Sequence, residues 1–411
     1  KRKIKFGISE TRAKELEEFA KQNNSDASND LLEEGKTYYN NGEYDKAIEI
    51  FKKAVELYPN DDNSWSRLGF SYAASGQYEK AIESFLKAIK IYPNSRDYWY
   101  QLGISYHDNE QYKEAIDSLS KAVELLNTEE EEEDFWDTDA SSDYRNRLGR
   151  SYNYNGQYKD AIDSLVKATQ LNPDDADNWH WLGISYRDDG QYKDAIDSLV
   201  KATQLNPDDA DNWHWLGISY RDDGQYQDAI DSLSKAVELN PDEYLSWYWL
   251  GISYYDNKQY QEAMNSLSKA VELNSDEYLS WYWLGSSYLN LKDYDNAVYS
   301  FDKSIKINPN NPYAWNDYGV ALVNLNRIDE AKSAYSKALE INPNYELSRN
   351  NLQILQSSNG GVSLNGVVSG ISKGIDTLNE LSGKINPSTI GMVVGAAKLV
   401  GKILGGSNKN K

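Results

Sequence analysis

The sequence predicts an all-α protein built as a linear array of helical hairpins, on two observations. A unit of 34 residues recurs along the chain, and the run Gly156–Tyr192 is identical to Gly190–Tyr226. Within each unit, apolar residues follow the spacing of one helix face twice, with a helix-breaking segment between the two. Because a single hairpin of this kind cannot bury its apolar face, successive hairpins must stack into one continuous core.

A glycine marks the same place in every unit: Gly35, Gly69, Gly103, Gly149, Gly183, Gly217, Gly251, Gly285 and Gly319. An alanine follows each of these glycines by twelve positions. The spacing is 34 residues throughout except between the third and fourth glycines, where it is 46. We therefore expect nine hairpins, three over residues 28–129 and six over 142–345, with an insert at 130–141.

The unit at 176–209 shows how one hairpin forms. Trp179, Leu182 and Tyr186 lie at helical spacing and give the first helix an apolar face. Gly190 can adopt a positive φ and so end that helix. A second apolar face begins at Tyr192, and the helix ends before Pro207, because the residue that precedes proline avoids helical dihedral angles.

The motif W-x2-L-G-x2-Y, followed by the alanine and a closing proline at a 34-residue period, resembles the tetratricopeptide repeat (TPR) over residues 28–345. The resemblance implies a right-handed superhelical α-solenoid in which the first helices line a concave groove. It also implies a scaffold or adaptor that binds proteins or peptides without catalysis. Residues 346–357, with Leu347, Leu352 and Leu355 on one face, are expected to form a helix that covers the last hairpin.

The two ends differ from the repeats in charge. The whole chain has a net charge of −22, whereas residues 1–27 carry seven Lys or Arg against five acidic residues. Residues 358–411 carry six lysines against two acidic residues. The repeat region is therefore strongly acidic, which argues against nucleic acid as a partner because phosphates would be repelled. We expect 1–27 to be a basic leader with a short helix, and the glutamate-rich insert 130–141 to be a solvated loop.

The tail at 358–411 reads as a helical hairpin with small-residue ridges, broken at Pro387. The residues expected to pack its helices closely are Gly366, Gly370, Gly374, Gly391 and Gly395. Lys398 and Lys402 interrupt the second segment, which is marginal in length for a membrane span. An oligomerisation module or a helix at a membrane surface fits this pattern better than a transmembrane helix.

No residue pattern points to catalysis, a metal or a cofactor. Cysteine is absent, and the three histidines lack acidic neighbours at the spacing of metal ligands. No phosphate-binding loop or nucleophile–base motif occurs. We expect a non-enzymatic protein, cytoplasmic because no signal peptide or clear transmembrane helix is evident; the chain begins at Lys1, which leaves processing open.

The partner-binding residues are expected among the first-helix positions that the family's packing pattern does not use. Aromatic and arginine side chains at such positions are typical of binding hot spots. The predicted groove residues are Asp177, His180, Trp181, Ile184, Arg187, Asp211, His214, Trp215, Ile218, Arg221, Tyr248, Trp249, Ile252, Tyr255, Tyr282 and Trp283.

Three hypotheses follow for the partner. The first is an adaptor that holds an extended or helical peptide. The second is a self-assembling subunit, a ring or filament, in which the basic tail occupies its own acidic groove or that of another copy. The third is an adaptor held at a membrane surface by the tail.

Overall fold

The computed structural model describes residues 30–129 and 138–357, and every element in these two ranges is a helix or a turn, as the all-α prediction requires. The predicted leader at 1–27, most of the insert and the five tail glycines Gly366, Gly370, Gly374, Gly391 and Gly395 lie outside the described residues. The chain divides into two compact units, 1–181 and 182–411, and each is described by itself.

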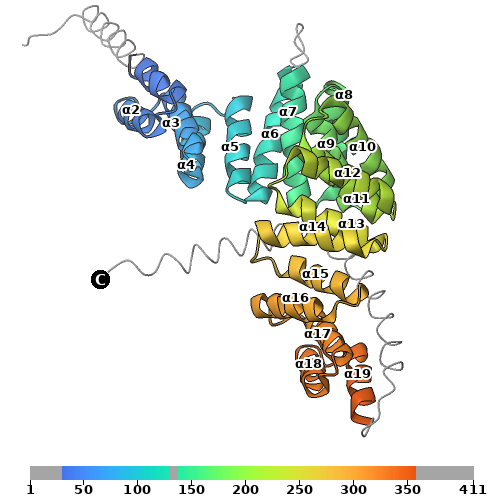
Figure 1. Ribbon diagram of the computed structural model, residues 1–411. Helices are drawn as coiled ribbons and strands as arrows, with labels where there is room; N and C mark the ends of the chain where they lie inside the picture. Colours follow the sequence, from blue (N-terminus) through green and yellow to red (C-terminus); the bar gives the residue numbers. More distant parts are fainter. Residues whose placement is uncertain (1–29, 130–137, 358–411) are drawn as a thin grey trace, which may run out of the picture. The chain divides into compact units, whose positions relative to one another are not determined.

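The first unit begins with a helical stretch at 30–40 and continues with paired helices (Figure 1). Their bounds are α2 (Tyr44–Leu57), α3 (Asp62–Ala74), α4 (Tyr78–Ile91), α5 (Arg96–Asp108), α6 (Tyr112–Glu129), α7 (Thr138–Tyr154) and α8 (Tyr158–Leu171). Helix α9 (Ala176–Asp188) crosses from the first unit into the second.

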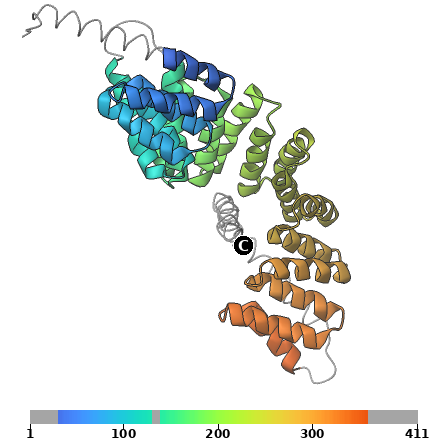
Figure 2. The ribbon, with the colours of Figure 1, turned by 90° about the vertical axis from the view of Figure 1, so that its left-hand side faces the viewer.

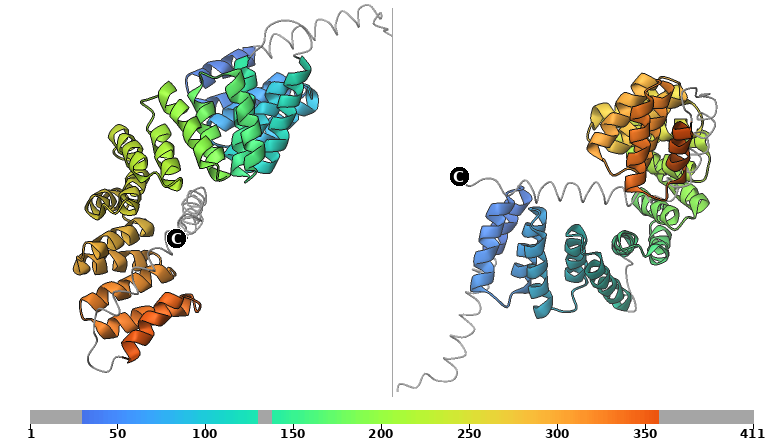
Figure 3. Two further views of the ribbon diagram at one scale, coloured as in Figure 1. Left: turned by 90° about the vertical axis from the view of Figure 1, so that its right-hand side faces the viewer. Right: turned by 90° about the horizontal axis from the view of Figure 1, so that it is seen from below.

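The second unit repeats the same hairpin up to its C-terminal helix, and its successive pairs can be followed in Figures 2 and 3. The helices are α10 (Tyr192–Leu205), α11 (Ala210–Asp222), α12 (Tyr226–Leu239), α13 (Tyr244–Asp256), α14 (Tyr260–Leu273), α15 (Tyr278–Asn290), α16 (Tyr294–Ile307), α17 (Pro312–Asn324), α18 (Ile328–Ile341) and α19 (Glu346–Ser357). Helix α19 packs against α18, as expected for a helix that covers the last hairpin, and Leu355 is buried.

The turn inside each hairpin requires a left-handed residue. Gly190 and Gly224 adopt φ of 81° there, as the sequence predicts for Gly190. Lys258, Lys292 and Asn326 occupy the same slot in later hairpins with φ of 62°, 62° and 59°. The turn geometry is therefore kept even where a side chain makes it less favourable.

The glycine that marks each unit has a different role, which is close packing. A Cβ atom at Gly217 would lie 2.5 Å from Leu233 Cγ and 3.1 Å from the carbonyl oxygen of Ala229. Leu233 is fully buried on α12, so it has no free space into which to move. The two helices of this hairpin can approach as closely as they do only because the position has no side chain.

We expect Gly217→Ala to lower the stability of its hairpin by about 1–3 kcal/mol, because the added methyl overpacks a filled core. Gly224→Asn is the matched comparison: its turn has nothing within 4 Å, and Asn326 already occupies the equivalent slot. Its cost should be about 1 kcal/mol or less. Amide hydrogen exchange over α11 and α12 measures both losses, and equal losses would contradict this separation of roles.

In the units that have it, the first tryptophan fixes the loop between hairpins. Trp213 Nε1 donates a hydrogen bond to the carbonyl oxygen of Pro207 at 2.8 Å, six residues earlier. The same bond joins Trp179 to Pro173 at 2.8 Å and Trp65 to Pro59 at 2.9 Å. This side chain therefore both packs against its neighbours and satisfies a carbonyl group at the end of the preceding unit.

The fourth hairpin departs from the pattern at its first helix. Helix α7 begins at Thr138, so the last four residues of the predicted insert 130–141 are helical. Ser141 and Ser142 are buried, at 2% and 1% exposure. The usual tryptophan is replaced by Arg145, as the sequence shows, and this loss of the motif hid the true start of the helix.

Candidate functional site

The predicted groove residues differ widely in exposure. Asp177 and Asp211 are exposed, and His180, Trp181 and Trp215 are half-buried. The remaining predicted residues are buried: Ile184, Arg187, His214, Ile218, Arg221, Tyr248, Trp249, Ile252, Tyr255, Tyr282 and Trp283. The surface available to a partner is therefore much smaller than the predicted set.

The cause of this burial is direct packing between first helices. In the second unit, α11 contacts α13, α13 contacts α15 and α15 contacts α17. Ile218 and Ile252, on α11 and α13, keep only 1% and 2% of their surface exposed. Residues at these positions thus contribute to the core between neighbouring hairpins, where large apolar side chains stabilise by losing contact with water.

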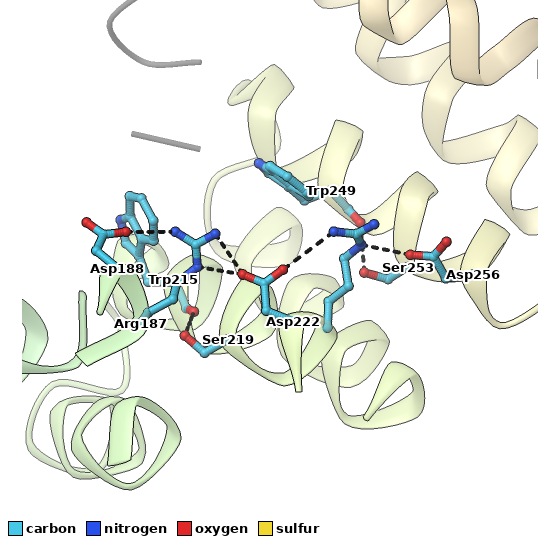
Figure 4. A network of polar contacts seen from close by, with 9 residues as sticks. Arg187, Asp188, Trp215, Ser219, Asp222, Trp249, Ser253 and Asp256 are labelled. Atoms are coloured by element: carbon cyan, nitrogen blue, oxygen red, sulfur yellow. Dashed lines mark hydrogen bonds and ion pairs between the residues drawn. The ribbon is translucent and has the colours of Figure 1, made fainter. Parts of the chain in front are cut away.

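A chain of buried ion pairs, formed by residues of the second unit, joins the three successive first helices α9, α11 and α13 (Figure 4). Arg187 on α9 donates to the Asp222 carboxylate on α11, with Nε and Nη2 at 2.8 and 2.7 Å from Oδ2. Arg221 on α11 lies 3.5 Å from the other oxygen of Asp222 and donates to Asp256 Oδ2 on α13 at 2.8 Å. Asp222 therefore lies between two arginines.

Each arginine also lies over an indole ring. The guanidinium carbon of Arg187 is 5.6 Å from the ring centre of Trp215, and that of Arg221 is 5.4 Å from the ring centre of Trp249. Burial alone would lower the pKa of Arg221, but Asp256 and Asp222 raise it, so the guanidinium stays charged. Cation–π contact and ion pairing together fix the orientation of these tryptophans.

Between α13 and α15, a neutral hydrogen-bonded pair takes the place of the ion pair, again with the partners 35 residues apart. Asn290 Nδ2 donates to the hydroxyl oxygen of Tyr255 at 3.0 Å, in the slots that Asp and Arg fill earlier. The Tyr255 ring meets Trp283 edge-on at 5.1 Å between centres. Neighbouring first helices therefore keep a polar contact at the same place, but here its two side chains are uncharged.

A second buried polar cluster joins α15, α17 and α19 near the C-terminal end of the described residues. Asp317 accepts hydrogen bonds from the Tyr282 hydroxyl at 2.8 Å and from Asn316 Nδ2 at 2.9 Å. Asn316 Oδ1 in turn accepts from Ser348 and Asn351 on α19. Burial raises the pKa of Asp317 to about 6.

In the first unit, α7 brings two further arginines to the face that the tryptophans occupy elsewhere. The Arg150 guanidinium carbon lies 4.5 Å from the ring centre of Trp181, and Arg147 is one turn earlier on the same helix. Burial, with Arg150 and Arg147 nearby, lowers the pKa of His107 to about 4. His107 is therefore neutral at pH 7, and its Nδ1 lies 2.9 Å from the Ser151 hydroxyl oxygen.

The pairing of Arg187 with Asp222 and the significance of Arg147 and Arg150 were not predicted from the sequence. The pairing does have a sequence signal, because an arginine and an aspartate recur 35 residues apart at 187 and 222 and again at 221 and 256. Arg147 and Arg150 were visible only as a departure from the tryptophan and isoleucine that fill those slots in the next three hairpins.

Within residues 30–129 and 138–357, no group of three His, Asp or Glu side chains is placed to hold a metal ion. In the same part of the chain, no helix has the length and apolarity needed to cross a membrane.

Family models for tetratricopeptide repeats match residues 149–187, 185–221, 216–277, 278–311 and 300–333. A model of the cilia and flagella-associated protein 70 C-terminal domain matches residues 8–136. No curated protein sequence matches the chain.

Several solved structures are similar to parts of the chain. MamA is 30% identical over 39% of this chain and 95% of its own length, with a TM-score of 0.38. YrrB, described as a TPR protein with an unusual peptide-binding site, is 24% identical over 48% of this chain and 96% of its own, with a TM-score of 0.39. PilF from Pseudomonas aeruginosa is 20% identical over 53% and 98%, with a TM-score of 0.47.

The family assignment depends on the repeat itself. The repeat models match residues 149–333 without a gap, and the structure forms paired helices at the same 34-residue period. The chain belongs to the tetratricopeptide-repeat family.

Proposed function

We propose that this chain is a non-catalytic scaffold that binds a protein or peptide segment on the exposed part of its first helices. In the second unit this surface is centred on Asp211 and Trp215 of α11. The equivalent residues in the first unit are Asp177 and Trp181 of α9. Partners with basic side chains fit best, because the repeat region is acidic.

One observation carries this proposal. The half-buried Trp215 is held against Arg187, whose guanidinium is itself fixed by Asp222 and Asp188. An aromatic side chain that keeps exposed surface and has little freedom loses little entropy on binding. Tryptophan side chains held in this way often anchor protein interfaces. The exposed Asp211 on the same helix adds a negative charge that can pair with a basic side chain of the partner.

Charge reversal tests the proposed surface. Asp211→Lys should abolish the capture of partner proteins by the tagged full chain, because it repels basic groups at the centre of the surface. Asp231→Lys, at an exposed position on the second helix α12, is the matched control and should capture the same proteins as the wild type. Equal capture by both variants, or equal loss, would contradict the proposal.

A second candidate function, self-assembly through the tail, is favoured by charge. Residues 358–411 have an excess of lysine, whereas the repeats are acidic, so the tail of one copy complements the repeats of another. Size exclusion with light scattering should show oligomers for the full chain and monomers for a chain that ends at Ser358. Monomers for both at high concentration would exclude assembly through the tail.

A further inference from the structure

We propose that Arg147 and Arg150 on α7 form a binding site for an oxyanion carried by a partner peptide, either a side-chain carboxylate or a phosphate. This site goes beyond the surface proposed above, because its arginines lie on another helix and select the opposite charge, although it adjoins Asp177 and Trp181. It lies entirely within the first unit.

The two arginines replace residues that the fold uses for packing. Arg147 occupies the slot of Trp181 and Trp215, and Arg150 occupies the slot of Ile184 and Ile218. Those isoleucines are 4% and 1% exposed. A guanidinium group cannot replace the apolar contact that such an isoleucine makes, although the guanidinium of Arg150 lies over the ring of Trp181.

The arginines retain hydrogen-bonding capacity. Within the described part of the chain, the Nε atoms of Arg147 and Arg150 are buried and have no hydrogen-bond partner. Asp143 lies 3.8 Å from Arg147 Nε, and Asp177 lies 3.8 Å from Arg150 Nη1. Both distances exceed the 2.7–2.9 Å typical of a charge-assisted hydrogen bond, so these carboxylates face the arginines without binding them closely.

The two arginines also affect each other. Burial lowers the pKa of Arg150, and the neighbouring Arg147 lowers it further, so the two guanidinium groups repel each other. An oxyanion between them would relieve that repulsion. The acidic groups facing the pair are Asp108, Asp143 and Asp177, and His107 is neutral at pH 7.

Aromatic side chains lie beside the two arginines. Tyr154 is 37% exposed, stacks on Tyr112 at 5.2 Å between ring centres and lies 5.7 Å from the ring of Trp181. The side chains of Arg147 and Arg150 are 38% and 21% exposed, so a ligand can reach both. This combination fits a peptide that presents an acidic or phosphorylated residue next to an apolar one.

The test is nuclear magnetic resonance of the full chain labelled with ¹⁵N-arginine, in which the Nε–H signals of Arg147 and Arg150 are assigned by single substitution to glutamine. Hexaglutamate and a phosphoserine hexapeptide are titrated separately. We expect at least one of them to shift both signals to saturation, while the signals of the ion-paired Arg187 and Arg221 stay in place. Saturation by hexaglutamate identifies carboxylate as the ligand, and saturation by the phosphopeptide alone identifies phosphate.

Substitution provides the second readout. R147Q with R150Q should weaken binding of the active peptide at least tenfold, whereas Arg96→Gln on α5, which removes one charge from the same unit, should change it less than twofold. R147W with R150I restores the side chains of later hairpins, so it should fold and lose binding. The proposal is overturned if neither peptide gives a saturable shift, or if Arg96→Gln weakens binding as much as the double variants. Either failure leaves capture through Asp211 unaffected.

Discussion

Asp222→Ala should destabilise the second unit by about 3 kcal/mol, because it leaves two buried guanidinium groups without their shared carboxylate. Arg187, Arg221 and Asp222 have side-chain exposures of only 4%, 7% and 12%, so water replaces little of the lost interaction. In this variant Arg187 still pairs with Asp188, and Arg221 still pairs with Asp256. The expected loss of stability is therefore at the lower end of the range for breaking a buried ion pair. Hydrogen exchange over α9, α11 and α13 measures it.

The neighbouring Asp223→Ala is the control. Asp223 accepts a hydrogen bond from Gln225 at the surface, and its removal should cost less than about 1 kcal/mol. A loss for Asp222→Ala no larger than that of Asp223→Ala would show that the ion pairs contribute little.

A double variant can replace one ion pair with the neutral pair that the chain already contains. Arg221→Tyr with Asp256→Asn copies the neutral Tyr255–Asn290 pair of the next step. Arg221→Tyr alone leaves Asp256 buried with an unpaired charge, so the double variant should be more stable than this single variant. The coupling energy from the double-mutant cycle should be about 1–3 kcal/mol. Purely additive effects would contradict direct pairing.

The second large effect is a pH dependence at Asp317. Its pKa is about 6 in the folded protein against 3.8 in the unfolded chain, because burial disfavours the carboxylate. The folded state therefore binds more protons than the unfolded state between these values, and its contribution to stability falls as pH rises through that window. The shift of about 2 units corresponds to about 3 kcal/mol, fully present below pH 4 and lost above pH 6.

Asp317→Asn should remove this dependence while it keeps a similar shape. Hydrogen exchange over α17 to α19, compared between wild type and variant at pH 4.5 and pH 7.5, isolates the effect from other titrating groups. Asp329→Asn, at a fully exposed side chain on α18, should leave the wild-type dependence unchanged. The assignment is wrong if Asp317→Asn retains the wild-type slope.

Helix bounds were predictable because the repeat signals them locally. The break around Gly190 and the stop before Pro207 agree with α9 ending at Asp188 and α10 ending at Leu205. The start of α7 at Thr138 was not predictable, since that hairpin lacks the tryptophan that marks the others.

The site was only partly predictable, for a physical reason. Periodicity tells which side of a helix a residue occupies, but not how near the next first helix lies. Ile218 and Tyr248 were expected on an open groove, and the contact between neighbouring first helices buries them. Arg221 is buried as well, because a carboxylate on the next hairpin offsets the desolvation of its charge.

Photo-crosslinking can show whether the partner binds on the exposed part of the first helices. A photoreactive amino acid is placed at position 211 on α11 and, in a separate chain, at position 231 on α12. Both positions are exposed, so neither substitution should disturb the fold. We predict a discrete crosslinked partner from position 211 and none from position 231. Crosslinks from 231 alone, or equally from both positions, would contradict binding at the first helices.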